Sequence, residues 1–141
     1  MKKFYVAYGS NLNLEQMAFR CPTAEIYGKG VIEDWELVFK TYATIEPKKG
    51  KYVPVGVWMI DEFCERRLDM YEGFPLHYRK EQIDVRMYNG EIVNAMVYLM
   101  NDAKIKAPTK KYFNTILQGY DEVGLDDRIL FDALDTAIQH V

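Results

Sequence analysis

Hydrophobic and polar positions near the start of the chain predict a strand followed by a helix. Residues 4–8 form a short, mostly apolar run that Gly9 ends, as expected of a buried strand that enters a tight turn. Asn13 then begins a helix, with Gln16 in the position of a capping-box partner. This helix should end before Pro22, because a proline ring clashes with the preceding helical turn.

The middle of the chain predicts strands and then a short helix. Residues 26–60 are rich in β-branched and aromatic side chains, and we expect several strands there, separated by a turn at residues 47–50. Asp61 can cap a helix that ends at Gly73. The residues on its apolar face have the spacing i, i+4, i+7 and are Cys64, Leu68 and Tyr71.

A hairpin and two helices complete the pattern. Residues 83–87 alternate between apolar and polar, Asn89-Gly90 is the favoured pair for a two-residue type I′ turn, and residues 91–100 return antiparallel. Apolar stripes over residues 113–120 and 129–138 predict two amphipathic helices. This order of elements predicts an α+β fold, in one domain over residues 1–141, with helices packed outside a strongly twisted sheet.

Composition and charge narrow the functional class. Of the 141 residues 49% are hydrophobic and 28% charged, the balance of a soluble globular protein, and eleven tyrosines favour a pocket with hydroxyl donors. The net charge of −3 and the lack of a basic stripe argue against nucleic-acid binding. No segment resembles a signal peptide or approaches the ~18 apolar residues of a membrane span. We therefore expect a cytoplasmic protein without a membrane partner.

The chain has only two cysteines and two histidines. Cys21 and Cys64 are too few for a disulfide scaffold and lack metal-ligand spacing, so we expect structural roles for both and no metal site. Ser10 and His77 do not suggest a catalytic triad, because the turn at Ser10 lacks the second glycine of a nucleophile elbow and an obvious pairing acid. We expect His77 at the surface or at the rim of a pocket.

The loop Tyr8-Gly9-Ser10-Asn11-Leu12 is the first candidate site. A glycine directly after a buried strand lets backbone N–H groups approach a ligand, and the start of the following helix adds partial positive charge. Such a junction suits a carboxylate, a phosphate or a developing oxyanion. The alternative is a plain turn in which Ser10 or Asn11 caps the helix.

Glu72 is the second candidate. It lies at the predicted end of a helix, where the carbonyl groups disfavour a carboxylate, and Tyr71, Phe74 and Pro75 surround it in the sequence. Both effects raise the pKa of a carboxyl group toward the range in which it can exchange a proton at neutral pH. The alternative is a solvent-exposed glutamate in a turn.

These features together resemble the γ-glutamylcyclotransferase-like family, which includes the AIG2-like (avirulence-induced) plant proteins. The resemblance runs nearly from end to end of the chain. The segments that carry it are residues 4–12, Arg20-Cys21-Pro22, Gly30, Asp34-Trp35, residues 55–58, Leu68-Asp69-Met70-Tyr71-Glu72-Gly73, Tyr78, residues 98–100, Pro108, Tyr112, Ile116, Gly119-Tyr120 and Gly124-Leu125.

The resemblance implies a small mixed β-barrel with a cavity at one side. Loop 8–12 would hold a small-molecule γ-glutamyl substrate through backbone N–H groups, and Glu72 would be the catalytic acid and base. Tyr112 matches a tyrosine that contacts substrate, and Tyr78 one that lines the cavity. The reaction implied is attack of the substrate's own α-amine on its γ-carbonyl, which releases 5-oxoproline and an amine or amino acid without any cofactor.

The family resemblance leaves the substrate and the retention of activity open. The loop Tyr8-Gly9-Ser10-Asn11-Leu12 is closer to the branch that acts on γ-glutamyl amino acids than to the branch that acts on γ-glutamylamines. One alternative is a cyclotransferase for a γ-glutamyl-tagged metabolite. Another is a non-catalytic module that binds a small molecule, although such a module has no use for an acid at position 72.

Overall fold

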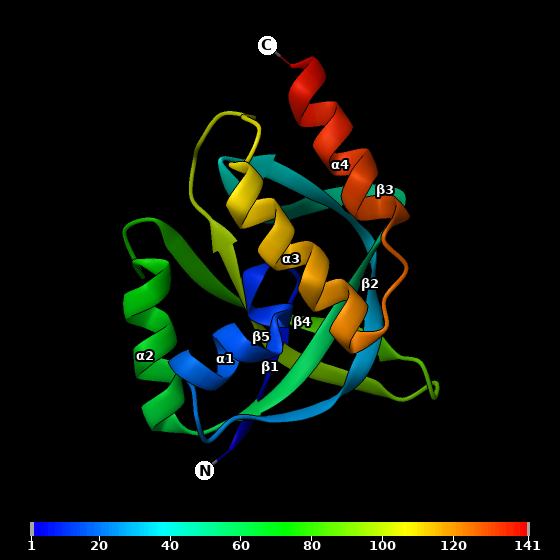
Figure 1. Cartoon of the computed structure of the whole chain (residues 1–141). Coiled ribbons are helices and arrows are strands. Elements are labelled where there is room, and N and C mark those ends of the chain that lie inside the picture. The colour runs from blue at the N-terminus through cyan, green and yellow to red at the C-terminus, as the bar shows by residue number, and fades with distance from the viewer. Residues whose placement is uncertain (1, 141) are drawn as a thin grey trace.

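The computed structural model, which describes residues 2–140, is built on a closed barrel of five strands in the order β1-β3-β2-β4-β5 (Figure 1). Neighbouring strands are antiparallel except where β1 meets β5 and closes the barrel in parallel, with Tyr5 opposite Met96. The strands are β1 (Lys3–Ala7), β2 (Glu25–Lys40), β3 (Tyr42–Ile60), β4 (Tyr78–Met87) and β5 (Ile92–Met100). The α+β barrel expected from the sequence is confirmed.

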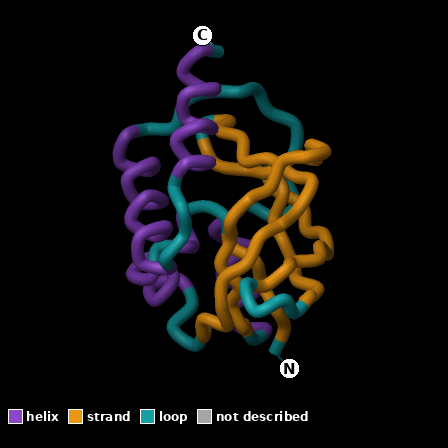
Figure 2. The backbone as a smooth tube through the Cα atoms, turned by 90° about the vertical axis from the view of Figure 1, so that its right-hand side faces the viewer, coloured by secondary structure: helices purple, strands orange, loops and turns teal. Residues whose placement is uncertain are grey.

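Most of the helices gather on one side of the barrel (Figure 2). A 3-10 turn, η1 (Ser10–Leu12), leads into α1 (Leu14–Arg20); α2 (Glu62–Glu72) follows β3, and α3 (Lys110–Val123) and α4 (Arg128–Gln139) end the chain. The predicted stripes of α3 and α4 face the core, with most of their residues buried or half-buried, although Ile138 at the end of the second stripe is exposed. No helix within residues 2–140 is long and apolar enough to cross a membrane.

Polar caps fix the ends of the two helices that frame the site. Asn13 caps α1 by accepting a hydrogen bond from the N–H of Gln16, but Gln16 Oε1 has no partner among the described residues, so only half of the predicted capping box forms. Asp61 accepts from the N–H of Cys64, as predicted for α2. Gly73 ends α2 with a φ of 68°, a left-handed conformation that glycine adopts without strain.

The prediction of a turn at residues 47–50 is wrong. These residues lie within β3, and the chain reverses from β2 into β3 at Thr41, whose φ is 69°. Gly50 belongs to an irregularity of the ribbon, where its N–H donates to Asp34 Oδ1 at 3.0 Å and both residues have positive φ. A bulge and a turn both call for glycine, so the local sequence does not distinguish them.

The β4–β5 hairpin is confirmed, but its turn is not of type I′. That type requires positive φ at both central residues, and within the described chain Gly90 has it (φ 92°) whereas Asn89 does not. The N–H of Gly90 donates to Met87 O, and the N–H of Met87 donates to Glu91 O. This is the longer hairpin loop in which a left-handed glycine forms a bulge next to a turn.

Cys21 and Cys64 form a disulfide, a pairing that the sequence did not predict. Their Cα atoms are 5.0 Å apart, and both residues are buried. The bridge joins the end of α1 to the first turn of α2. Both cysteines therefore have a structural role, and this role bears on the site because α2 carries Glu72 at its other end.

Candidate active site

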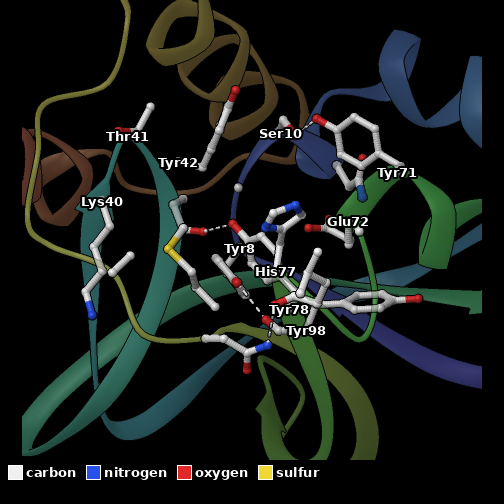
Figure 3. A pocket seen from close by; sticks show the side chains of 18 of the residues that line it. Tyr8, Ser10, Lys40, Thr41, Tyr42, Tyr71, Glu72, His77, Tyr78 and Tyr98 are labelled. Atoms are coloured by element: carbon white, nitrogen blue, oxygen red, sulfur yellow. Dashed lines mark hydrogen bonds between the residues drawn. The ribbon is translucent and has the colours of Figure 1, made fainter.

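A cavity of about 710 Å³ opens between the loop after β1, the end of α2 and the β2–β3 turn (Figure 3). It brings together residues that are distant in the sequence. Seven of the eight predicted site residues line it, namely Tyr8, Gly9, Ser10, Asn11, Glu72, Tyr78 and Tyr112. Leu12 does not line it and is fully buried beneath the loop, where it anchors η1 in the core.

The loop after β1 offers three backbone amides. The N–H of Leu12 donates to Gly9 O and the N–H of Asn13 to Ser10 O, both at 3.0 Å, so these two amides serve the turn itself. Among the described residues, no backbone hydrogen bond uses the N–H of Gly9, Ser10 or Asn11. Amides left free next to a cavity are suited to an anion or to a developing oxyanion.

The position of Gly9 depends on its missing side chain. A Cβ atom there would lie 3.3 Å from the Cβ of Ala43 and 3.6 Å from the hydroxyl of Tyr112. The loop therefore passes closely between the β2–β3 turn and α3.

The side chains of the loop bond within the site and do not cap the helix. Ser10 Oγ lies 3.3 Å from the Tyr71 hydroxyl, not against His77, and Asn11 Nδ2 donates to the Tyr5 hydroxyl at 2.9 Å. The alternative that Ser10 or Asn11 caps the helix is wrong, because Asn13 fills that position.

Glu72 is the last residue of α2 and points into the cavity, near Tyr8, Tyr71 and His77 (Figure 3). Burial raises the pKa of its carboxyl group to about 7, while the charge of Arg20 acts in the opposite direction. The alternative of a fully solvent-exposed glutamate in a turn does not hold. The burial comes from the wall of the cavity more than from Phe74 and Pro75, which are themselves exposed.

Tyrosines form much of this wall. Burial raises the pKa of each of these phenols above its ordinary range, so they stay neutral at the pH where Glu72 titrates. The residues concerned are Tyr5, Tyr8, Tyr78, Tyr98 and Tyr112.

Tyr78 and Tyr112 both form hydrogen bonds with the main chain of Ala43, next to the β2–β3 turn. The Tyr78 hydroxyl donates to Ala43 O at 3.0 Å, and the Tyr112 hydroxyl accepts from Ala43 N at 3.1 Å. The proton of the Tyr78 hydroxyl is thus used, while that of Tyr112 stays available to a ligand. His77 lines the cavity from its exposed rim, where the sequence placed it.

Several residues that shape the site were not predicted from the sequence. Arg20 and Tyr71 back the loop, and Thr41 and Tyr42 line the far side of the cavity. The wrongly placed turn at residues 47–50 hid the last two. No cluster of three or more histidine, cysteine or acidic side chains that could hold a metal ion occurs among residues 2–140.

The raised pKa of Glu72 predicts a pH-dependent cost to stability. The folded state binds this proton more tightly than the unfolded chain, so the free energy of unfolding falls as the pH rises from about 4.5 to about 7. At ~1.4 kcal/mol per pKa unit, reduced for partial exposure, Glu72→Gln should stabilise the protein by about 2 kcal/mol at pH 8 and hardly at all at pH 4.5. Urea unfolding at both pH values measures the difference.

Glu62→Gln is the matched control, because Glu62 is exposed in the first turn of the same helix. An anionic side chain is favourable there, so this substitution should not stabilise the protein. A stability gain for Glu72→Gln that is equal at pH 4.5 and pH 8 would contradict the assignment of a raised pKa.

A half-buried carboxyl group that titrates near neutral pH, placed opposite free loop amides, defines an acid/base site suited to acyl chemistry. Comparison with known proteins agrees with this class. Residues 5–118 match the model of the family described as "Gamma-glutamyl cyclotransferase, AIG2-like". The chain belongs to this family and is a γ-glutamylcyclotransferase-like enzyme.

Individual relatives show how far the similarity extends. The bovine and human proteins named γ-glutamylcyclotransferase are each 30% identical over 134 residues, which cover 86% of this chain and 71% of theirs. A solved structure titled γ-glutamyl cyclotransferase superposes with a TM-score of 0.85 at 25% identity, covering 98% of this chain and 87% of that one. A human structure superposes with a TM-score of 0.84, also at 25% identity.

Proposed function

We propose that this protein is a cytoplasmic γ-glutamyl cyclotransferase that releases 5-oxoproline from a small γ-glutamyl compound, with Glu72 as its acid and base. The observation that carries the proposal is a carboxyl group with a pKa of about 7 that shares one cavity with the free amides of Gly9 to Asn11. Half of such a group is ionised at neutral pH. It can therefore accept a proton in one step and return it in the next.

The reaction needs few groups because the nucleophile belongs to the substrate. The Glu72 carboxylate removes a proton from the α-ammonium, and the free amine attacks the γ-carbonyl to form the ring C–N bond. The loop amides stabilise the oxyanion, and Glu72 then protonates the leaving nitrogen as the original amide bond breaks. The remaining extra proton of the ring nitrogen passes to the departing amine, which leaves as its ammonium ion. Tethering of the nucleophile makes orientation the main requirement and removes the need for a covalent enzyme intermediate.

The leaving group that we favour is an amino acid. Supporting this, the loop sequence Tyr8-Gly9-Ser10-Asn11-Leu12 resembles the γ-glutamyl-amino-acid branch of the family. Tyr112 and Tyr42, whose rings meet edge to face at 5.2 Å between centroids, line the cavity and supply apolar surface for the substrate.

The decisive experiment measures 5-oxoproline from a panel of γ-glutamyl amino acids, γ-glutamylamines and glutathione, with Glu72→Gln as the control enzyme. Release from γ-glutamyl amino acids that Glu72→Gln abolishes supports the proposal. Turnover of γ-glutamylamines alone would overturn the choice of leaving group. Tight binding of a panel member without turnover would instead identify a non-catalytic module.

Activity should survive exhaustive chelation, because every step above is assigned to protein side chains and amides. Prolonged dialysis against EDTA is expected to leave kcat/KM unchanged within error. A loss that zinc or manganese reverses would show that the mechanism is wrong. Unfolding curves before and after dialysis control for a structural effect of the treatment.

A further inference from the structure

Arg20, the last residue of α1, lies directly behind the loop and the end of α2. Its guanidinium carbon is 3.2 Å from the centroid of the Tyr71 ring, which is a stacked cation–π arrangement. One guanidinium nitrogen donates to Ser10 Oγ at 3.3 Å and to Asn11 Oδ1. One side chain thus contacts both the substrate-binding loop and the residue next to Glu72.

The end of α1 is itself fixed to α2, so Arg20 has a defined position. The Cys21–Cys64 disulfide joins the two helices immediately after Arg20. Arg67 of α2 donates to the carbonyl oxygens of Phe19 (3.2 Å) and Arg20. These contacts satisfy the last carbonyl groups of α1 and hold its final turn against α2.

Arg20 does not line the cavity that holds Glu72. It borders a separate groove on the other side of Tyr71, so Tyr71 and the loop stand between the guanidinium and the substrate. Arg20 can therefore act on the reaction only through other residues. Its two routes are the geometry of the loop and the electric field at Glu72.

Among the described residues, Arg20 is the charged group whose field lowers the pKa of Glu72 against the effect of burial. The other titratable groups around Glu72 come from several elements. Neutral phenols face it from β1, β4, β5 and α3, and Tyr71 precedes it on its own helix. The remaining titratable side chains on the cavity are Tyr42, His77, Lys40 and Asp102, of which Lys40 is paired with Glu46 at 2.6 Å.

We propose that Arg20 is a positioning residue of this site, which clamps Ser10 and Asn11 against Tyr71 and keeps a positive charge behind Glu72 without touching the substrate. This inference rests on the proposed function, because it assigns a second role in the same acid/base reaction. The clamp needs the planar guanidinium fork of arginine, which stacks on the Tyr71 ring while one of its nitrogens serves both Ser10 and Asn11. The field needs only a positive charge, which lysine also supplies.

This difference between arginine and lysine allows the two roles to be separated. In Arg20→Gln both are lost, and in Arg20→Lys the charge stays while the fork is lost. Arg20→Met keeps the aliphatic packing without charge, and it replaces Arg20→Gln if that variant folds poorly. Thermal unfolding of each variant shows whether the barrel is intact before any titration.

The first measurement is a ¹³C NMR titration of the Glu72 carboxyl, assigned by its absence in Glu72→Gln. Arg20→Gln should shift its midpoint upward by about 0.5–1 pH unit, at or just below the ~1 unit that a directly adjacent opposite charge contributes at least, because Tyr71 and the loop stand next to the guanidinium. In Arg20→Lys, which keeps the positive charge, the midpoint should return most of the way to its wild-type value. The titrations are repeated with His77→Asn added to the wild type and to each Arg20 variant, so that an effect of the imidazole on Glu72 is not mistaken for an effect of Arg20.

The second measurement is the pH profile of kcat and KM with a substrate found in the panel. In Arg20→Gln the acid limb should move with the NMR midpoint, so that kcat/KM falls ~3–10-fold more at pH 6 than at pH 8.5. In Arg20→Lys the acid limb should return to its wild-type position. KM should be raised in both variants, because the loop is no longer clamped in either. A merely structural role for Arg20 would lower the rate equally at every pH.

Two results would overturn the inference: an unshifted Glu72 midpoint in both Arg20→Gln and Arg20→Met, or a midpoint in Arg20→Lys displaced as far as in Arg20→Gln. The NMR titration needs no substrate. A wild-type protein that releases no 5-oxoproline therefore contradicts the proposed function, while the titration still decides whether Arg20 controls the charge of Glu72.

Discussion

Replacing Glu72 by glutamine should lower kcat for 5-oxoproline release by at least ~10²-fold, the low end of what a positioned general acid/base contributes. The amide has nearly the same size and can still hydrogen-bond, but it cannot exchange a proton near neutral pH. Because Glu72 stands at the cavity wall and the free amides lie in the loop, substrate affinity should change little. Single-turnover rates and binding isotherms measure the two effects separately.

The same substitution should also make the protein more stable at pH 8, because it removes a carboxyl group whose pKa is raised in the folded state. Loss of rate together with gain of stability is expected where a functional group is held in an unfavourable environment. Glu62→Gln, the same chemical change at an exposed position of α2, should leave both properties nearly unchanged. Turnover by Glu72→Gln within a few-fold of wild type would refute the catalytic role.

Features with local causes were predictable from the sequence. Asn13 and Asp61 cap the helices where an acceptor side chain precedes an apolar periodic segment. Most of the residues in the stripes of α3 and α4 face the core because their spacing places them on one face. In each case the residues that determine the structure are within a few positions of one another.

Features that depend on distant residues were not predictable. The β2–β3 ribbon continues past residues 47–50 because β2 pairs with β3 up to Pro47 and again from Tyr52, and this pairing on both sides outweighs a local turn signal. The reversal at Thr41 uses a positive φ on a β-branched residue, which sequence patterns disfavour. The Cys21–Cys64 pairing likewise depends on how α1 and α2 pack.

The residues of the candidate site also fall into those that the local sequence predicts and those that only the fold brings together. Gly9 and Glu72 were recognisable from their local surroundings, Gly9 as a glycine directly after a buried strand and Glu72 as a carboxylate at a helix end, where it is unfavourable. Arg20 carries no such signal, since a basic residue at the end of a helix is ordinary. Its importance arises only where the fold brings it onto Tyr71 and the loop.

Gly119→Ala should destabilise the protein and displace the loop after β1. Gly119 is buried on α3 where that helix meets η1, and an added Cβ would lie 2.6 Å from both Asn13 N and the carbonyl carbon of Leu12. These are main-chain atoms of the segment that carries the free amides, so they cannot move aside by a change of rotamer. Either the helix or the loop must shift.

Two opposing effects set the expected size of the change. Alanine is a better helix former than glycine by ~1 kcal/mol, while overpacking a close contact costs ~1–3 kcal/mol, and more when backbone must move. We expect a net loss of about 2 kcal/mol, which lowers Tm by roughly 6 °C for a chain of this size. Because small displacements of positioning groups can cost up to ~10²-fold in rate, kcat/KM should fall by roughly tenfold or more.

Asn114→Ala on the exposed face of the same helix separates helix propensity from the clash. It gains helix propensity without meeting another element, so it should stabilise the protein slightly and leave kcat/KM unchanged. Thermal unfolding and 5-oxoproline assays on both variants measure the contrast. If Gly119→Ala proved as stable and as active as Asn114→Ala, then the close packing of α3 against η1 would not be what holds the loop amides beside Glu72.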